Sequence, residues 1–356
     1  MSFLNPSPQA FGLDINDFSL KLVKLVKLGK KIELKSYNLI TIPPGVVSNG
    51  EIKDPLVFIT SLQKLIKTRH GGGSLGREVI TVLPETKTFL KNIIIDKPDN
   101  NEDLEPKIIK EIEKNLPYNL LEVYLDWQIF NQPNENKTNI LVGAAPQKVV
   151  NEYLAVLQQA GLAPLALEIE AVALGRSLIN PKQDLTDTAS IIIDLGATRS
   201  GLVIYNQGIP QTTISLPIAG NQITQKIIDT LQLNWEQAEK AKIICGLNKA
   251  KCSGALNEIL DQTFTDLAEK INQAVEFYYD HFTNPNKIKE ILICGGGANF
   301  SEIDEVLTQK TGITTKIGNP WINLANNQKT PLPNDQALIF TSAIGLALRG
   351  LDSENI

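Results

Sequence analysis

Short apolar runs separated by turn residues fill the first forty positions of the chain, and the same pattern returns near its middle. The runs predict two sets of three strands, at 10–15, 20–28 and 32–42 and at 190–194, 201–205 and 210–216. In each set an acid ends the first strand, Asp14 in one and Asp194 in the other, and a turn follows it. Such a hairpin can bring backbone N–H groups onto a phosphate, while its acid can hold a magnesium ion. The repeat therefore predicts a two-lobed clamp on a nucleotide.

Elsewhere the apolar spacing alternates between helical and strand periods. Asp54, with Pro55 behind it, predicts the start of a helix with an apolar stripe that continues to Ile66. Further helices are expected at 102–116, 146–161, 170–179, 220–231, 235–244, 256–281 and 335–348. Further strands are expected at 79–83, 89–95, 123–130, 140–144, 164–169 and 290–294, with loops at 70–74, 131–138 and 180–188. Two triple-strand units with returning helices predict an α/β fold in two lobes, the first of them interrupted by a block at 78–161.

Length and composition agree with this outline. A chain of 356 residues, 42% hydrophobic and 21% charged, is long enough for two domains with separate cores. The net charge of −5 gives no electrostatic reason to expect a nucleic-acid partner. No apolar run approaches the ~18 residues of a membrane span, and the first ten residues predict no secretory signal. The three cysteines contain no CxxC pair, so we expect free thiols in a reducing cytoplasm and no zinc site.

A glycine run supplies a third motif. The strand expected at 290–294 leads into Gly295-Gly296-Gly297, and Ser301 with Asp304 three residues later predicts a capped helix behind it. Glycines in such a turn let the backbone approach a nucleotide without a Cβ clash. Two strand-end acids followed by this turn form a more specific pattern than any one of the three motifs.

In this order of motifs the chain resembles the actin–hexokinase–chaperone superfamily of ATPases. Within it the chain is most similar to the type IV pilus assembly protein PilM family, which is related to FtsA. The stretches that carry the resemblance are FGLDI, SLKLV, ITIPPGVV, VLPETKTFLKNI, EIEKNLPYNLLEVYLDWQIF, ILVGAAPQKVVNEYLAVLQQAGLAPLALEIEAVAL, SIIIDLGATRSGLVIY and ILICGGGANF. The resemblance implies a two-lobed actin-like fold with duplicated βββαβα cores and an inserted FtsA-like subdomain. Its implied parts are the first lobe at 1–77 and 162–187, the insertion at 78–161, and the second lobe at 188–222, 223–288 and 289–356.

The resemblance also implies ATP and Mg²⁺ as ligands, with Asp14 and Asp194 holding the metal. Lys21 would reach a phosphate, although it can equally be a solvated residue in a series of strand lysines. The residues implied for the two phosphate turns are Asn16, Asp17, Ser19, Gly196, Ala197 and Thr198.

Further site residues follow from the same resemblance. Glu170 matches the position that orients the attacking water, and a plain helix-start acid is its alternative. Glu239 and Lys242 would face adenosine, or form an ordinary surface ion pair. The remaining adenosine-side residues are Gly295, Gly296, Gly297 and Asn299.

The first hairpin departs from the family pattern, which has Asp-Ile-Gly followed by small residues. Here Asn16, Asp17 and Phe18 follow Asp14-Ile15. Asn tolerates left-handed backbone angles, so the turn itself can survive. Asp17 would repel the γ-phosphate, and we therefore expect at most weak ATPase activity and greater dependence of ATP binding on the second hairpin.

By resemblance the function is that of a cytoplasmic, ATP-binding assembly protein at the inner face of the cytoplasmic membrane. Its expected partner is the N-terminal peptide of a PilN-like membrane protein, held between the first lobe and the insertion, and through it a PilO-like protein. Self-association into rings is a further expectation, and membrane contact would come only through the partner. The alternatives are a sugar or carboxylate kinase of the same fold, which would need a catalytic base beside its substrate, and an FtsA-like division protein.

Overall fold

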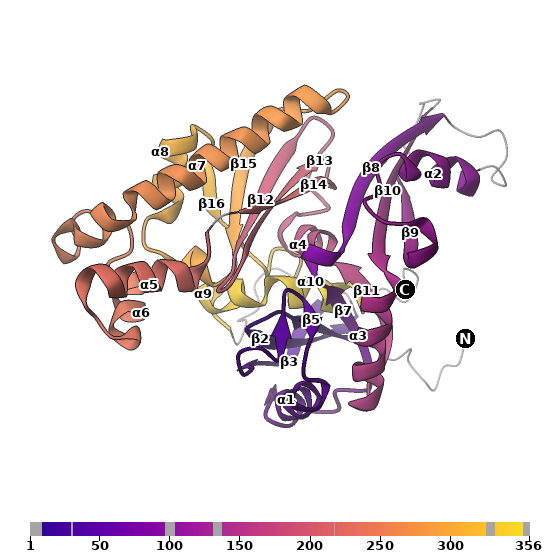
Figure 1. The fold of residues 1–356 in the computed structure, drawn as a ribbon, viewed down its shortest axis with the longest axis horizontal. Coiled ribbons are helices and arrows are strands. Elements are labelled where there is room, and N and C mark those ends of the chain that lie inside the picture. Colours follow the sequence, from indigo (N-terminus) through magenta and orange to yellow (C-terminus); the bar gives the residue numbers. More distant parts are fainter. Residues whose placement is uncertain are drawn as a thin grey trace. The chain divides into compact units, whose positions relative to one another are not determined.

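The computed structural model describes residues 9–29, 31–96, 104–130, 137–216, 218–324 and 332–351. Contacts between residues divide the chain into two units (Figure 1). The first contains the chain up to Ala173, the short stretch Ile209–Thr212 and the residues from Ser342 onward. The second contains Leu174–Gly208 and Thr213–Thr341.

A six-stranded sheet forms the base of the first unit, with strand order β11-β7-β1-β2-β3-β6. Neighbouring strands from β1 to β6 on one side are antiparallel, whereas β7 and β11 run parallel on the other. The strands are β1 (Phe11–Ile15), β2 (Ser19–Leu28), β3 (Lys31–Thr41), β6 (His70–Gly71), β7 (Glu78–Leu83) and β11 (Ala163–Ile169). The expected strand triplet at the N-terminus is confirmed. The loop expected at 70–74 is wrong at its start, because His70 stacks on Tyr37 and its backbone joins the sheet as β6.

Two amphipathic helices bury their apolar faces in the core of this unit. In α1 (Pro55–Lys67), Asp54 caps the first turn as predicted, with Oδ1 accepting from the Val57 N–H at 3.1 Å. In α3 (Gln147–Gln159), Tyr153 is buried and donates from its hydroxyl to the Gly50 carbonyl at 2.8 Å. Both helices contribute to one buried cluster that also contains apolar residues of β1 and β2, which explains why apolar residues recur at helical spacing in these segments.

Backbone packing without intervening side chains brings the last helix, α10 (Thr341–Arg349), into the first unit. A Cβ on Gly12 of β1 would stand 2.1 Å from the Ala343 carbonyl oxygen, and one on Gly345 would stand 1.9 Å from that of Ala173. The prediction of a single helix at 335–348 is wrong. The segment consists of α9 (Asn334–Ala337), a 3-10 turn η6 (Leu338–Phe340) and α10. The helix breaks where the Leu338 carbonyl accepts from the Gly295 N–H and the Thr341 hydroxyl.

A smaller body follows β7 in the first unit. Its three-stranded sheet has the order β8-β10-β9, and α2 covers one face through a core built on Ile108 and Ile112 (Figure 1). The elements are β8 (Phe89–Asp96), α2 (Leu104–Glu113), the 3-10 turn η3 (Leu120–Glu122), β9 (Val123–Phe130) and β10 (Lys137–Pro146). The block expected at 78–161 contains this body together with β7 and α3, which belong to the six-stranded sheet and its core. Most of the loop expected at 131–138 lies outside the described residues.

The second unit is built on a five-stranded sheet with the order β14-β13-β12-β15-β16. Strands β12 and β13 form the antiparallel hairpin that was predicted, and β15 pairs in parallel with both β12 and β16. The strands are β12 (Ala189–Leu195), β13 (Ser200–Asn206), β14 (Ile209–Leu216), of which Ile209–Thr212 is counted with the first unit, β15 (Ile288–Cys294) and β16 (Thr315–Ile317). The helices are α4 (Glu170–Leu178), which begins in the first unit, α5 (Gly220–Leu231), α6 (Trp235–Ile244), α7 (Ala255–His281) and α8 (Ile303–Thr311).

Two local expectations in this unit are wrong. Ser301 does not cap α8, because the helix begins one residue later, behind Glu302 in a left-handed conformation with φ of 64°. Cys245 and Cys252 are not free thiols but form a disulfide, with their Cα atoms 5.8 Å apart. Seven positions separate them, and only the folding of the segment after α6 brings them together. Cys294 is buried and takes part in no disulfide, as expected.

Among the helices that the structure describes, none combines the length and the apolar character that a membrane crossing requires.

Candidate nucleotide-binding residues

In the second unit the predicted acid and the glycine turn lie directly against each other. Asp194 pairs with Gly201 of β13 on one side and with Cys294 of β15 on the other. Gly295, the next residue after β15, has a φ of +79°, and a Cβ there would lie 2.2 Å from Asp194 Oδ1. Only glycine satisfies both conditions. Strand pairing therefore places the carboxylate beside a backbone that carries no side chain.

The second predicted phosphate turn, Gly196 to Thr198, lies against the N-terminus of α5. The Gly220 N–H donates to the Gly196 carbonyl at 2.9 Å, and the Asn221 N–H donates to the Ala197 carbonyl at 2.8 Å. These bonds fix the turn at the N-terminus of α5, and they occupy the first two N–H groups of that helix.

Glu239 and Lys242 are joined in one cluster rather than as an exposed surface pair. Lys242 Nζ lies 2.5 Å from Glu239 Oε1 and 2.7 Å from the Thr224 hydroxyl of α5, and its side chain is only 11% exposed. The Thr224 hydroxyl also donates to Glu239. The Lys242 ammonium stands 5.8 Å from the ring centroid of Phe300, which follows the glycine turn. The cluster therefore connects α5, α6 and the segment after β15.

The glycine turn itself is short and fixed at both ends. Gly296–Asn299 forms a 3-10 turn, η5. The Gly295 N–H donates to the Leu338 carbonyl at 3.1 Å, and Asn299 Nδ2 donates to the Asp335 carbonyl at 2.9 Å. A Cβ on Gly297 would approach that of Leu195 to 2.6 Å, so this turn also lies on the end of β12.

In the first unit Asp14 and Lys21 face each other across the predicted hairpin. They are register partners on β1 and β2, and Lys21 Nζ lies 2.6 Å from Asp14 Oδ2, with both side chains largely buried. The lysine is therefore not a solvated strand residue. Asn16 closes the turn, since its Oδ1 accepts from the N–H groups of Phe18 at 3.0 Å and Ser19 at 2.8 Å. The side chain of Asn16 thus uses two N–H groups that a phosphate turn could otherwise present.

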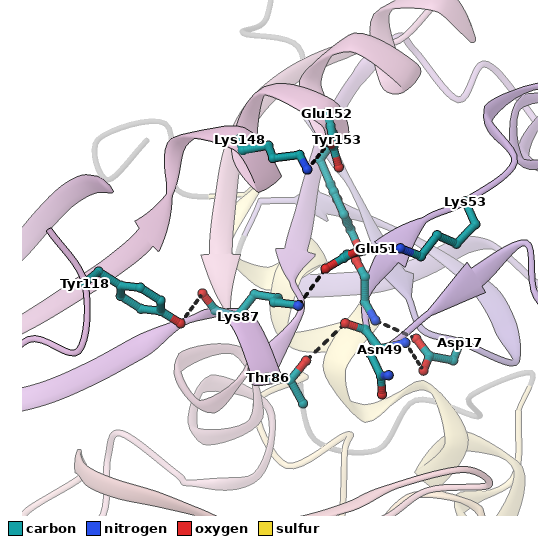
Figure 2. A network of polar contacts seen from close by, with 11 residues as sticks. Asp17, Asn49, Glu51, Lys53, Thr86, Lys87, Tyr118, Lys148, Glu152 and Tyr153 are labelled. Atoms are coloured by element: carbon teal, nitrogen blue, oxygen red, sulfur yellow. Dashed lines mark hydrogen bonds and ion pairs between the residues drawn. The ribbon is translucent and has the colours of Figure 1, made fainter. Parts of the chain in front are cut away.

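Asp17 anchors this hairpin to the next one along the chain. Its carboxylate accepts from the N–H groups of Asn49 and Gly50, each at 2.9 Å, between the short strands β4 (Val47–Ser48) and β5 (Glu51–Ile52) (Figure 2). Asp17 is predicted from the sequence to repel a γ-phosphate, and the sequence alone does not reveal these two bonds. A carboxylate that accepts two backbone N–H bonds has a structural role on this hairpin.

The same network continues to the start of the smaller body. Glu51 accepts from Lys53 and from Lys87, the latter at 2.7 Å, and these bonds lower the pKa of Glu51 to about 2. Lys87 lies in the 3-10 turn η1 (Glu85–Lys87), directly before β8, and its carbonyl accepts from the Tyr118 hydroxyl (Figure 2). Contacts therefore run from the first hairpin to the base of the three-stranded sheet.

Replacing Asp17 tests its structural role. Asp17→Ala leaves two backbone N–H groups without their carboxylate acceptor, and we expect a loss of about 1–3 kcal/mol in the free energy of unfolding. Asp17→Asn keeps one acceptor oxygen and should lose less. Thermal unfolding and ATP titration of both variants are the measurements. An unchanged melting temperature together with tighter ATP binding would instead support phosphate repulsion by Asp17.

Glu170 begins α4 and lies near the start of α10. Its Oε1 accepts from the Ser342 hydroxyl at 2.7 Å. The bond orients the Glu170 carboxylate. The role of Glu170 in orienting the attacking water stays a prediction.

Sequence reasoning missed three contributors to these groups. Thr224 and Phe300 join Glu239 and Lys242 only through the packing of α5, α6 and the turn, and Ser342 reaches Glu170 from the far end of the chain. In the part of the chain that the structure describes, no cluster of three or more His, Cys, Asp or Glu side chains could hold a metal. Weak carboxylate ligation of a phosphate-bound magnesium ion needs no such cluster.

Solved structures of other proteins share the fold of this chain. The structure is similar to a chain of a PilM–PilN type IV pilus biogenesis complex, with a TM-score of 0.80 and 24% identity over 98% of this chain and 100% of that chain. It is also similar to MreB 5 of Spiroplasma citri bound to AMPPNP, with a TM-score of 0.52 and 16% identity over 97% of this chain and 96% of that chain. The predicted actin-like fold of two α/β units is thereby confirmed.

The family follows from the sequence. The model of the family described as type IV pilus assembly protein PilM matches residues 12–351, so the chain belongs to that family. The cell division protein FtsA of Neisseria meningitidis is 23% identical over 60% of this chain and 54% of its own length. The chain spans about half the length of the FtsA relatives that it matches. The family match favours pilus assembly over the kinase and division alternatives.

Proposed function

We propose that this chain is a nucleotide-binding assembly protein of the type IV pilus inner-membrane platform, which captures the N-terminal cytoplasmic peptide of a PilN-like membrane protein. The observation that carries the proposal is the family match across residues 12–351, and the similarity to a chain of a PilM–PilN complex supports it. In this role the chain lies at the inner face of the cytoplasmic membrane and contacts it through the partner. A PilO-like protein reached through PilN and self-association into rings are further parts of the proposal.

The nucleotide in this proposal is ATP with Mg²⁺. Three features of the second unit support it: the glycine backbone against Asp194, the turn of Gly196 to Thr198 at the start of α5, and the Glu239–Lys242 cluster. Asp194, and Asp14 in the first unit, offer oxygen ligands of the kind that Mg²⁺ prefers. A bound magnesium ion would offset the charge of the phosphates.

Exposed apolar side chains mark the proposed peptide surface, where the smaller body joins α3. Leu121 is 84% exposed and Tyr124 is 49% exposed. Their backbone segment is held to α3, because Gln147 Nε2 donates to the carbonyls of Leu121 and Val123 and the Tyr124 hydroxyl reaches Asn151 Oδ1 at 3.4 Å. Neighbouring exposed apolar side chains on a fixed backbone can accept the apolar residues of a captured peptide.

Isothermal titration of the PilN-like N-terminal peptide tests this function, with and without ATP and Mg²⁺. We expect saturable binding to the unaltered chain, and at least tenfold weaker binding to the double variant Leu121→Ser with Tyr124→Ser, because it loses the apolar anchors.

Leu56→Ser is the matched control. Leu56 is also strongly exposed, at 77%, but lies on α1. Binding that falls equally in both variants would place the peptide elsewhere, and no binding to the unaltered chain would overturn the proposed partner.

A further inference from the structure

The Cys245–Cys252 disulfide lies in the second unit, between the end of α6 and the 3-10 turn η4 (Cys252–Gly254). Cys245 is buried, whereas Cys252 is exposed. One sulfur-bearing residue is therefore open to a reaction partner while the other is protected behind it. The separation of the Cα atoms, 5.8 Å, is normal for a disulfide, so the pair can close with the backbone in place.

The segment closed by this disulfide lies on the residues that follow the glycine turn. A Cβ on Gly246 would stand 2.5 Å from the Ser301 nitrogen, and the Leu247 N–H donates to the Ser301 carbonyl at 2.9 Å. Asn248 Nδ2 also bonds to the Glu302 carboxylate. This segment, 245–252, therefore holds Ser301 and Glu302, the residues that follow η5 and Phe300 in the sequence.

The other end of the segment continues the helix that carries Glu239 and Lys242. The Cys245 N–H donates to the Ala241 carbonyl at 2.8 Å, so Cys245 completes the last turn of α6. Lys242 lies in that turn, and its ammonium faces the Phe300 ring. The disulfide therefore closes a segment that continues the helix of Glu239 and Lys242 and also bonds to Ser301, the neighbour of Phe300.

We propose that the Cys245–Cys252 pair is a reversible redox site that sets the nucleotide affinity of the second unit. The reaction partner is a dithiol–disulfide protein of the thioredoxin class or a small disulfide such as oxidised glutathione. The Cys252 thiolate attacks the partner's disulfide and releases one thiol, and Cys245 then displaces the second thiol as the intramolecular bond forms. Two protons and two electrons leave the pair, the partner's sulfur–sulfur bond breaks, and reduction reverses each step.

The link acts by restricting a short segment. Closing 245–252 removes conformations in which Gly246 and Leu247 leave Ser301, so the oxidised form keeps the segment behind Phe300 ordered. Reduction releases this restraint, and ATP must then order the segment as it binds. The effect on affinity rests on the proposed function, whereas the redox reaction of the pair does not.

The test compares full-length protein equilibrated with oxidised glutathione and with dithiothreitol. Alkylation under denaturing conditions should find one thiol in the oxidised form, since the disulfide uses two of the three cysteines, and three in the reduced form. Titration with ATP and Mg²⁺ should give a Kd that is three- to tenfold higher after reduction. The double variant Cys245→Ser with Cys252→Ser should bind like the reduced form and ignore both reagents.

Hydrogen exchange at 239–254 and 295–302, measured without nucleotide, separates the possible failures. Faster exchange after reduction, with no ATP binding in either state, would overturn the proposed nucleotide function and its redox control. The effect of the disulfide on the order of segment 245–252 would still stand. Equal exchange and equal ATP affinity in the two states would overturn the regulatory proposal. Failure of the cysteines to pair in oxidised glutathione would overturn the redox site itself.

Discussion

Replacing Asp194 with Ala is expected to abolish ATP binding, with a loss of affinity on the order of 100-fold or more, equivalent to about 2.7 kcal/mol. The carboxylate stands at the end of β12, beside the Gly295 backbone, which has a left-handed conformation with no room for a Cβ. Its removal takes away the negatively charged ligand for a phosphate-bound magnesium ion and leaves the glycine turn without its neighbour. No other acid in the strand pairs at this end of β12 replaces it, since its register partners are Gly201 and Cys294.

Titration of the purified variant with ATP and Mg²⁺ measures this effect, and circular dichroism checks that the fold is intact. Asp266→Ala is the matched control, because Asp266 is an exposed acid on α7 of the same unit. Undiminished binding in Asp194→Ala would mean that the nucleotide site lies elsewhere.

Excision of the smaller body is expected to abolish recruitment to membranes that carry a PilN-like protein while nucleotide binding survives. The register of β8 and β10 makes the excision feasible, because Phe89 pairs with Ala144. Thr88 and Ala145 are therefore neighbours, and a short glycine–serine linker between them removes 89–144 without opening the six-stranded sheet. This cut is milder than removal of 78–161, which would take β7 and α3 out of the core of the first unit.

The measurement is co-sedimentation with vesicles that do or do not contain the PilN-like protein, together with ATP titration of the same sample. Intact ATP binding shows that a loss of recruitment is not a loss of folding. Leu56→Ser, with the smaller body in place, should sediment like the unaltered chain. Recruitment that persists after excision would place the partner surface outside the smaller body.

The chain's local patterns were sufficient to predict the strand triplets, most of the helices and the order of the three motifs. These features depend on short-range periodicity and on turn residues, both of which are written in consecutive positions. The Asp54 cap and the hairpin that follows Asp194 are examples, because each is determined by residues only a few positions apart.

Contacts between distant residues were decided only in the tertiary structure. The sequence predicts Asp17 only as a repulsive charge, because the donors to its carboxylate, the N–H groups of Asn49 and Gly50, lie more than thirty positions away. The break before α10 was likewise missed, since the Leu338 carbonyl finds its donor at Gly295. In both cases a polar group is satisfied by a backbone atom that no periodic pattern can identify.

By itself, then, the sequence determined the type and order of the elements, the acids that end the strands, and the family to which the chain belongs. The tertiary structure decided which side chains share a partner: Lys242 with Thr224, Glu170 with Ser342, and Cys245 with Cys252. The physical reason is that secondary structure follows from local backbone preference and burial. The pairing of a carboxylate, an ammonium or a thiol instead depends on the position that packing gives to segments far apart in the chain.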